Sequence, residues 1–541
     1  MKKSTILIAF ALLFGSCVKD TIDDLSKIKG VTAESNWMLP VVDAEAGLEK
    51  FIGGVDDKVE IVADDQGKLT LIFAGRDSLG EKQLVSIDPL SVNQTLSLPA
   101  PAIPVFEAVG VFNESINDRV SLNLGSGINV DNLQIKKGKI AVNITNSFQH
   151  NTFIKISYPA ITKGGMPLVD SFEFNYTGTP HNPITRTTSL DGYEIDANSD
   201  INNPGTIPYV VEFRLQKVTG SITTPADAIV FNQNLTIEEY AKAEGYFGPI
   251  ELLTLKEASR LGVFDKKIDG NVFINDPRLR IKVYNTIGMP IQGKISKMVI
   301  VAGLGDTVPV DINPFRDTFS INYTTIQGQE AITEYVIDRN NSNLDEVISS
   351  APQYFIYEIT FTANADNVPR TNVIYDKSTI KVDASFEIPA DLRIVSYGVE
   401  SQQSFSLKND LNQLDSDGVF IEYAEALSEI TNQMPLGAFV QVYFKDTITN
   451  TVLDSLYESQ FVVPASQVNA SGRVIAPSVR QSTTFIDKAK YDRITSANAY
   501  SFFVRFRTSE FNSTQPFVVF YKQDKLRFKM GLKTKVKYQT P

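Results

Sequence analysis

A threefold internal repeat is the feature that most constrains what this chain can fold into. Three segments share the order strand, Asn, turn and strand, around Asn146, Asn285 and Asn432, which lie 139 and 147 positions apart. An aromatic residue and an Ile-Asp pair follow at offsets of 50, 53 and 55 positions, ending at Asp196, Asp338 and Asp487. An aromatic strand and a polar hairpin come next in each segment. Four matches in the same order at nearly constant offsets predict a true repeat.

The period of the repeat predicts domains rather than short solenoid turns. Copies of about 145 residues can each bury their own core, so we expect three linked domains with modest contacts between neighbours. The predicted copies span 100–245, 246–390 and 391–541. A hairpin that begins at Val59 resembles the closing hairpin of a copy, so we expect residues 41–99 to form an N-terminal β region, a partial copy. Gly245 to Pro249 is predicted to be an exposed turn between the first two copies.

The hydrophobic pattern has a period of two along most of the chain, which is typical of β-strands. Helical patterns are few, and the candidate segments are 237–243, 344–348 and 422–430. Antiparallel hairpins cover their edges most simply when two sheets pack face to face. The sequence therefore predicts an all-β protein, an elongated tandem array of three related β-sandwich-like domains.

The amino terminus has the organisation of a signal peptide. Lys2 and Lys3 precede an apolar run from Ile6 to Phe14, and small residues then lead to Cys17, the only cysteine. This segment resembles the lipobox of bacterial lipoproteins. The resemblance implies that 1–16 is removed, that Cys17 carries the lipid, and that 17–40 forms a flexible tether.

The residues after Cys17 indicate to which membrane the protein is sorted. Val18 is not the Asp that retains many bacterial lipoproteins at the inner membrane, so the resemblance implies the outer membrane. Asp20, Asp23 and Asp24 are similar to the acidic export signals of surface lipoproteins of the Bacteroidota, although any tether tends to be charged. We expect the cell surface in preference to the periplasmic face.

Composition restricts the function. The net charge of −12 would repel a nucleic acid. One Cys and two His leave too few ligands for a disulfide framework or a His/Cys metal site. We expect no catalytic residue, no cofactor and no metal. The repeated Asn and Asp are interpreted as turn and cap residues, and His150 and His181 as surface residues.

A weak family resemblance lies in the second copy, in Asn275-Asp276-Pro277-Arg278-Leu279, then Val283-Tyr284-Asn285 and Pro290-Ile291. These residues resemble the WHy or type-2 late-embryogenesis-abundant domain, a small β-sandwich. The resemblance implies a sandwich and no activity.

The leading functional hypothesis is a non-enzymatic, outer-membrane-anchored scaffold or binding subunit with protein partners in an envelope complex. The alternatives are a lipid or glycolipid carrier, and a polysaccharide-processing or glycan-binding surface protein. Loops on a rigid β-scaffold favour recognition, so Thr177 to Ser189 and Asp311 to Glu330 are the predicted recognition loops, with solvated connections as the alternative.

Overall fold

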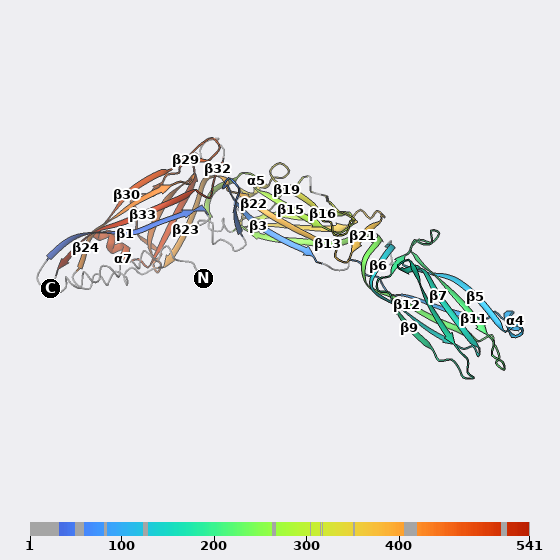
Figure 1. Cartoon of the computed structure of the whole chain (residues 1–541). Coiled ribbons are helices and arrows are strands. Elements are labelled where there is room, and N and C mark those ends of the chain that lie inside the picture. Colours follow the sequence, from blue (N-terminus) through green and yellow to red (C-terminus); the bar gives the residue numbers. More distant parts are fainter. Residues whose placement is uncertain are drawn as a thin grey trace.

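The computed structural model describes residues 32–48, 59–80, 84–122, 128–261, 267–302, 305–313, 315, 317–349, 352–404, 419–509 and 517–539. The predicted signal peptide and Cys17 lie outside the described residues. The described chain is antiparallel β-structure, interrupted by the short helices α4 (Ala102–Val109), α5 (Leu344–Ile348) and α7 (Lys488–Thr495). The all-β prediction is therefore confirmed. Three groups of strands follow one another along an elongated molecule (Figure 1).

The group farthest from the chain ends is here called the distal unit. Strands β4-β12-β6-β9 and β5-β11-β7-β8 form its two faces, and β10 pairs with both β6 and β7. Between the faces, the buried hydroxyl of Tyr158 donates a hydrogen bond to Gln233. The strands of the distal unit are β4 (Leu90–Ser97), β5 (Val111–Ser121), β6 (Asn129–Asn146), β7 (Asn151–Lys163), β8 (Met166–Phe174), β9 (Ile184–Ser189), β10 (Glu194–Asp196), β11 (Thr206–Gln216) and β12 (Ala228–Tyr246).

The next group is the middle unit. One sheet has the order β2-β3-β22-β15-β19, and the other has the order β13-β20-β16-β17, with β18 also on β16. Phe355 and Phe386 stack across the two sheets at 4.3 Å between ring centroids. The strands are β2 (Val59–Ala63), β3 (Leu69–Leu79), β13 (Ile250–Arg260), β15 (Arg278–Asn285), β16 (Ile291–Val301), β17 (Thr307–Pro309), β18 (Phe319–Ile321), β19 (Ala331–Ile337), β20 (Tyr354–Ala363), β21 (Asn372–Tyr375) and β22 (Ile380–Pro389).

The proximal unit contains both described ends of the chain. Its sheets have the orders β1-β33-β24-β30 and β14-β23-β31-β25-β26, with β27 also on β25. Ile430 of one sheet packs with Phe461 and Val463 of the other. The strands are β1 (Thr32–Gly47), β14 (Lys267–Ile274), β23 (Asp391–Ser404), β24 (Val419–Asn432), β25 (Leu436–Asp446), β26 (Thr451–Ser455), β27 (Phe461–Val463), β28 (Gln467–Val468), β29 (Val474–Ala476), β30 (Ser478–Asp487), β31 (Ala499–Thr508), β32 (Val518–Val519) and β33 (Lys525–Gln539).

The same pairing order occurs in all three units. Each closing strand (β12, β22 or β33) lies between a strand from the N-terminal segment (β4, β3 or β1) and the strand that ends at a repeated Asn (β6, β15 or β24). Of the helical candidates, 344–348 is α5, whereas 237–243 lies in β12 and 422–430 in β24. Segment 422–430 is paired with β30 and β33, and segment 237–243 is paired with β6 and, at its end, with β21. This pairing fixes the strand in both, because a tertiary ladder outweighs local helix propensity.

The N-terminal segment is distributed along the whole molecule. The sequence predicts a tether up to residue 40 and an N-terminal β region over 41–99. In the structure β1 begins at Thr32 and belongs to the proximal unit, β2 and β3 belong to the middle unit, and β4 belongs to the distal unit. Trp37, within the predicted tether, lies in β1 opposite Thr534. The physical reason is that each closing strand otherwise presents an unpaired edge, which an added strand satisfies.

The joints between units are more extensive than the sequence predicts. The turn expected to be exposed at Gly245 to Pro249 contains Phe247, which is only 2% exposed. Strand β21 of the middle unit pairs with the end of β12, and β14, which follows β13 in the chain, pairs with β23 of the proximal unit. A continuous hydrophobic core runs through the distal and middle units. At the second joint a smaller cluster includes Leu69, Ala390 and Phe520.

Ion pairs accompany the pairing of the first and last described strands. Cations alternate along β33, and Arg527 pairs with Asp43 of β1 at 2.9 Å while Lys525 pairs with Glu45 at 2.6 Å. The side-chain hydrogen bond from Arg527 lowers the pKa of Asp43. Exposed pairs of this kind add little stability, but they favour one register of β1 over a shifted one.

We predict that the fragment 391–541, which the sequence suggests should fold alone, does not fold stably. It lacks β1 and β14, which pair with β33 and β23. Hydrogen exchange should show that the amides of β33 are protected in the full chain and exchange rapidly in the fragment.

The matched control carries residues 32–47 fused through a flexible linker to the C-terminus of the fragment. Restored β1 should return protection to β33 but not to β23, which still lacks β14. Equal protection of β33 with and without residues 32–47 would contradict the role given to β1.

Candidate functional site

The repeated asparagines have one local role in all three units. The side-chain Oδ1 of each accepts the main-chain N–H two residues on, at Phe148, Ile287 and Met434, at 2.9 to 3.0 Å. The side-chain amide groups donate to Thr152 in the distal unit, to Ile287 and Asn322 in the middle unit, and to Leu436 and Pro464 in the proximal unit. All three asparagines are buried. They fix the turn, as the sequence predicts, and none of the three has a positive φ.

The repeated aspartates cap the strand that they end. The carboxylate of Asp196 accepts the N–H of Asn198, and that of Asp338 accepts the N–H of Asn340. Asp487 is the N-cap of α7 and accepts the N–H of Lys490 at 2.7 Å. The cap interpretation is therefore confirmed for all three.

The buried Asn turns mark one end of each unit, which we call the asparagine end. In the middle unit this end meets the distal unit, because Asn364 donates to both Gly248 and Asn372 beside Met289. In the proximal unit it meets the middle unit, because Met434 packs with Ala390 and Leu69. The asparagine end of the distal unit has no neighbouring unit and forms the free tip of the molecule (Figure 1).

Helix α4 covers this free end. Pro101 and Pro104 suit the first turn of a helix, and Gly110, with φ of 76°, ends it by donating its N–H to the carbonyl of Phe106. These prolines and Gly110 are the helix signal in the sequence, although α4 is not among the three predicted helical segments. Phe106 is buried, and its ring lies edge-on to the ring of His150, with 5.1 Å between the ring centroids.

His150 connects the parts of the tip. Its prediction as a surface residue is wrong, since it is fully buried. The N–H of Val218 donates to Nδ1 at 3.2 Å, so Nε2 carries the proton and donates to Thr223 at 2.8 Å. The carbonyl oxygen of His150 accepts a hydrogen bond from Nε2 of His181 at 3.1 Å. Burial lowers the pKa of His150, while the carboxylates of Glu107 and Asp227 oppose this shift and Lys217 adds to it.

Glu107 fastens α4 to the loop between β11 and β12. Its carboxylate pairs with Lys217 at 2.6 Å and accepts the N–H of Thr223 at 3.2 Å. The hydrogen bond from Lys217, and then the one from Thr223, lower the pKa of Glu107. The ion pair and the hydrogen bond hold α4 in place against this loop.

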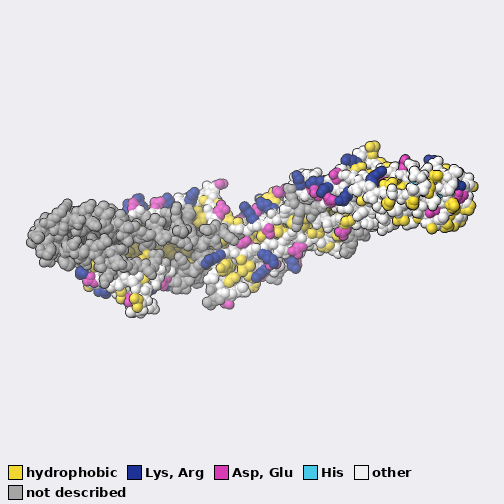
Figure 2. Space-filling model, turned by 90° about the horizontal axis from the view of Figure 1, so that it is seen from below, with side chains coloured by type: hydrophobic (Ala, Val, Ile, Leu, Met, Phe, Trp, Pro, Cys, Tyr) yellow, Lys and Arg dark blue, Asp and Glu magenta, His cyan; other side chains and the backbone are white. Residues whose placement is uncertain are grey.

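The tip surface is poor in charge and carries exposed apolar side chains. Its four segments, 97–110, 147–150, 175–183 and 217–227, contain three charged residues, Glu107, Lys217 and Asp227. Val105 is 60% exposed, Val109 67% and Ile222 69%. Figure 2 shows apolar side chains gathered at the right-hand end of the molecule, which is the distal unit.

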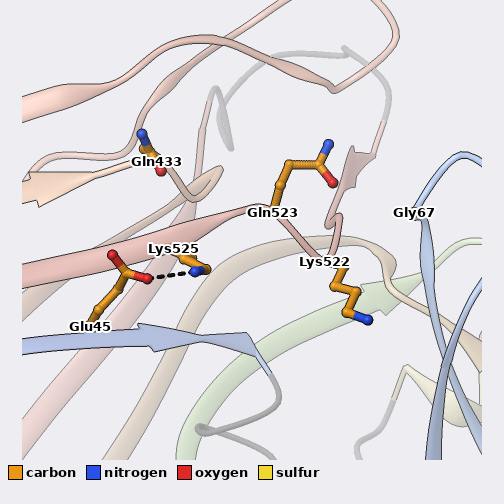
Figure 3. A pocket seen from close by; sticks show the side chains of 6 residues that line it. All are labelled: Glu45, Gly67, Gln433, Lys522, Gln523 and Lys525. Atoms are coloured by element: carbon orange, nitrogen blue, oxygen red, sulfur yellow. Dashed lines mark ion pairs between the residues drawn. The ribbon is translucent and has the colours of Figure 1, made fainter.

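A hollow of about 580 Å³ lies where the middle and proximal units meet. Glu45 and Lys525 point toward one another across it and form an ion pair of 2.6 Å, with Gln433 above and Lys522 beside them (Figure 3). Burial raises the pKa of the neighbouring Asp524 to about 6. The hollow is open and polar, and it is better explained as a seam between units than as a ligand site.

A second hollow, of about 550 Å³, lies on the proximal unit. Val462 and Ile475 are exposed on its lining, and the guanidinium of Arg507 lies 4.9 Å from the ring centroid of Phe439. Gly437 allows β25 to approach Ala465, because a Cβ at Gly437 would lie 2.8 Å from the main-chain nitrogen of Ala465. The hollow is an open surface depression.

The predicted recognition loops are only partly loops. Residues 184–189 form β9 and pair with β6, so only the first half of the stretch from Thr177 is a connection, and it lies at the tip. In the stretch from Asp311, Phe319 is buried and contacts Phe315 and Phe361. Ile326, later in that stretch, is exposed.

Cys17, the predicted lipid attachment residue, lies outside the described residues. Within the described part of the chain, no three His, Cys, Asp or Glu side chains are grouped so that they could hold a metal ion. No helix among those same residues is long and apolar enough to cross a membrane.

Comparisons with known proteins give only distant likenesses. No protein-family model matches the chain. No curated protein matches it either. One similar crystal structure is a protein from Parabacteroides distasonis ATCC 8503, provisionally described as secreted, at 10% identity, with 92% of this chain and 99% of that one covered and a TM-score of 0.25.

Virus proteins are also among the similar structures. An empty particle of cowpea mosaic virus matches at 11% identity, with 28% of this chain and 82% of that one covered and a TM-score of 0.16. Infectious bursal disease virus, Gx strain, matches at 8% identity, with 90% and 82% covered and a TM-score of 0.14. With TM-scores this low, these overlaps carry no information about function.

We predict that Asn146→Ala lowers the free energy of unfolding by about 1–3 kcal/mol, because the change leaves the buried N–H of Phe148 without its acceptor and removes the amide that donates to the hydroxyl of Thr152. Chemical denaturation measures the effect. Asn143→Ala is the matched control, since Asn143 lies on the same strand and bonds Thr185 at an exposed position. Equal effects of the two changes would refute the structural role of Asn146.

We predict that His150 makes the tip less stable in acid. The pKa of His150 is lowered from 6.5 in the folded protein, so below pH 6.5 the unfolded chain gains a proton that the folded chain does not accept. This contribution to stability is intact above pH 6.5 and decreases as the pH falls below it.

The measurement is an NMR titration of His181→Gln, which leaves His150 as the single histidine. The Nδ1 resonance should report an unprotonated nitrogen at pH 7 and a pKa below 6.5. A pKa at or above 6.5 would contradict the buried, neutral state.

Proposed function

We propose that this protein is a non-enzymatic, lipid-anchored scaffold or binding subunit of the outer membrane, which holds its distal tip away from the membrane surface for a protein partner. One observation carries the proposal. Strand β1 begins fifteen positions after Cys17 and lies in the proximal unit, whereas the free asparagine end lies at the opposite end of the molecule (Figure 1). A lipid on Cys17 would therefore leave the tip as the part farthest from the anchor.

The connections between units support a rigid spacer. Each joint is crossed by the N-terminal segment in one direction and by the returning chain in the other. Strand pairing crosses the first joint through β21 with β12, and main-chain hydrogen bonds cross the second joint from Leu69 to Phe520 and from Lys522 to Gly67. Bending at a joint would break main-chain hydrogen bonds and expose buried side chains such as Phe247. A spacer of this kind keeps its tip at a fixed distance from its base.

The lipobox resemblance of Cys17 and the residues after it support the outer membrane, and Asp20, Asp23 and Asp24 favour the cell surface over its periplasmic face. A lipid carrier or a polysaccharide-binding protein would need one of the two hollows as its ligand site. Both are open depressions, and one of them is lined by an ion pair, so neither resembles an enclosed site for an acyl chain or a sugar.

We predict that Cys17→Ala moves the protein from the membrane fraction to the soluble fraction of the envelope, because a diacylglyceryl thioether and an N-acyl chain provide the anchor. Mass spectrometry of the mature N-terminal peptide should show acylated Cys17 in the unaltered protein. Thr21→Ala is the control and should stay in the membrane. An unmodified peptide, or a Cys17→Ala variant that stays membrane-bound, would contradict lipid attachment at Cys17.

The scaffold function itself is tested in intact cells. A photo-crosslinking amino acid is placed at Val109 of the distal unit, at Ile326 of the middle unit or at Ile448 of the proximal unit, all of which are exposed. A scaffold should form a reproducible adduct with an envelope protein from one of these positions. No adduct from any of the three would argue against a scaffold.

A further inference from the structure

The distal tip is equivalent to two surfaces that are already interfaces within this chain. In each unit a tight turn precedes the closing strand: the N–H of Thr224 donates to Asp227, that of Tyr375 to Ser378, and that of Tyr521 to Asp524. Two residues earlier are Ile222, Val373 and Val519. Val373 and Val519 lie at joints between units and are 8% and 7% exposed, whereas Ile222 is 69% exposed. The free end therefore lacks the cover that its two counterparts have.

Helix α4 takes the place of a neighbouring unit only in part. It lies just before β5 in the chain, as Phe247 lies just before β13 and Ala390 just before β23. At the second joint the N–H of Phe520 donates to the carbonyl of Ala390 at 2.9 Å. At the tip the corresponding N–H, of Thr223, donates to the carboxylate of Glu107. α4 thus supplies an acceptor for a main-chain N–H that a neighbouring unit satisfies at the second joint.

The tip is closed to an added strand. The position of Lys522, whose N–H donates to Gly67 across the second joint, is taken at the tip by Pro225, which has no N–H. Proline on an edge prevents strand addition. A partner must therefore bind through side chains, and the large apolar ones exposed at the tip are Val105, Val109 and Ile222.

The chemistry of this surface selects the class of partner. An end unit of an array normally turns a polar face to solvent, whereas this one has only three charged residues in its four segments and exposes three large apolar side chains. Anionic lipids and nucleic acids are bound by Lys and Arg, and the one cation of the tip, Lys217, is paired with Glu107. Depletion of charge around exposed apolar side chains is the mark of the centre of a protein interface.

We propose that the outer face of α4, with Val105 and Val109, together with Ile222, is the docking surface for a folded protein that presents an apolar, charge-poor surface of its own. This inference rests on the scaffold function proposed above and names the place and the chemistry of the contact. Binding there depends little on salt, because no exposed ion pair forms in it.

The experiment uses the full chain with p-benzoylphenylalanine in place of Val109, in intact cells, and mass spectrometry identifies the adduct. The identified protein is then purified, and its affinity for the unaltered chain and for two variants is measured. Val105→Asp should weaken binding at least about tenfold, because a carboxylate enters an apolar contact. Raising NaCl from 50 to 500 mM should change the affinity less than about threefold.

Ile201→Asp is the matched control. Ile201 is exposed in the same unit, in the loop that approaches Asn129 at the joint, and its change should leave binding as it was. Both variants should keep the thermal midpoint of the unaltered chain, because both side chains are exposed.

Four results would overturn the proposal. An adduct from Ile326 or Ile448 but not from Val109 would remove the tip while leaving the scaffold function intact, and no adduct from any position would remove both. Flotation of the Cys17→Ala chain with phosphatidylethanolamine and phosphatidylglycerol vesicles, if abolished by Val105→Asp, would assign the tip to lipid. Dimers in sedimentation velocity, abolished by the same change, would assign it to a second copy.

Discussion

The structure depends on the main-chain pairing between the first and the last described strands. β1 and β33 pair from Thr32 and Gln539 to Gly47 and Lys525, so the two ends of the described chain lie side by side in one sheet. The chain between them therefore leaves the proximal unit and returns to it. Given that closure, the chain can reach the distal unit only by passing through the middle unit twice. This path makes the joints resistant to bending, because more than one segment of the chain crosses each of them.

The three asparagines show how one local solution is used in different surroundings. Each side chain satisfies the same N–H two residues on, while its amide donates to a different partner in each unit. The turn that results lies at a joint in two units and at the free tip in the third. Met289 faces a neighbouring unit, whereas the corresponding position in the distal unit is His150, which bonds Thr223 beneath α4. At the free tip, a polar network and a short helix thus occupy the place that a neighbouring unit has at the other two asparagine ends.

The sequence allowed the local features of the fold to be predicted better than its connectivity. Alternating apolar residues identify the strands, and the spacing of Asn285 and Asp338 identifies a turn and a cap that the structure contains. What periodicity cannot express is which strands pair, since the edge that receives β1 lies almost five hundred positions away. His150 was misjudged because its partners, Val218 and Thr223, come from a loop that is distant in sequence. α4 is not among the predicted helices because it lacks a polar N-cap and, apart from Glu107, consists of apolar residues.

The path of the N-terminal segment also sets an order of folding. β4 meets β12 within the first half of the chain, β3 must wait for β22, and β1 must wait for β33, so the three closures are nested one inside another. The entropy lost on closing a loop grows with its length, and non-local pairing slows folding. The tip is therefore assembled first and the base last. A chain interrupted before its final strand would carry a finished tip on an open base, and would present to any quality-control protease the edge of β24 that β33 should cover.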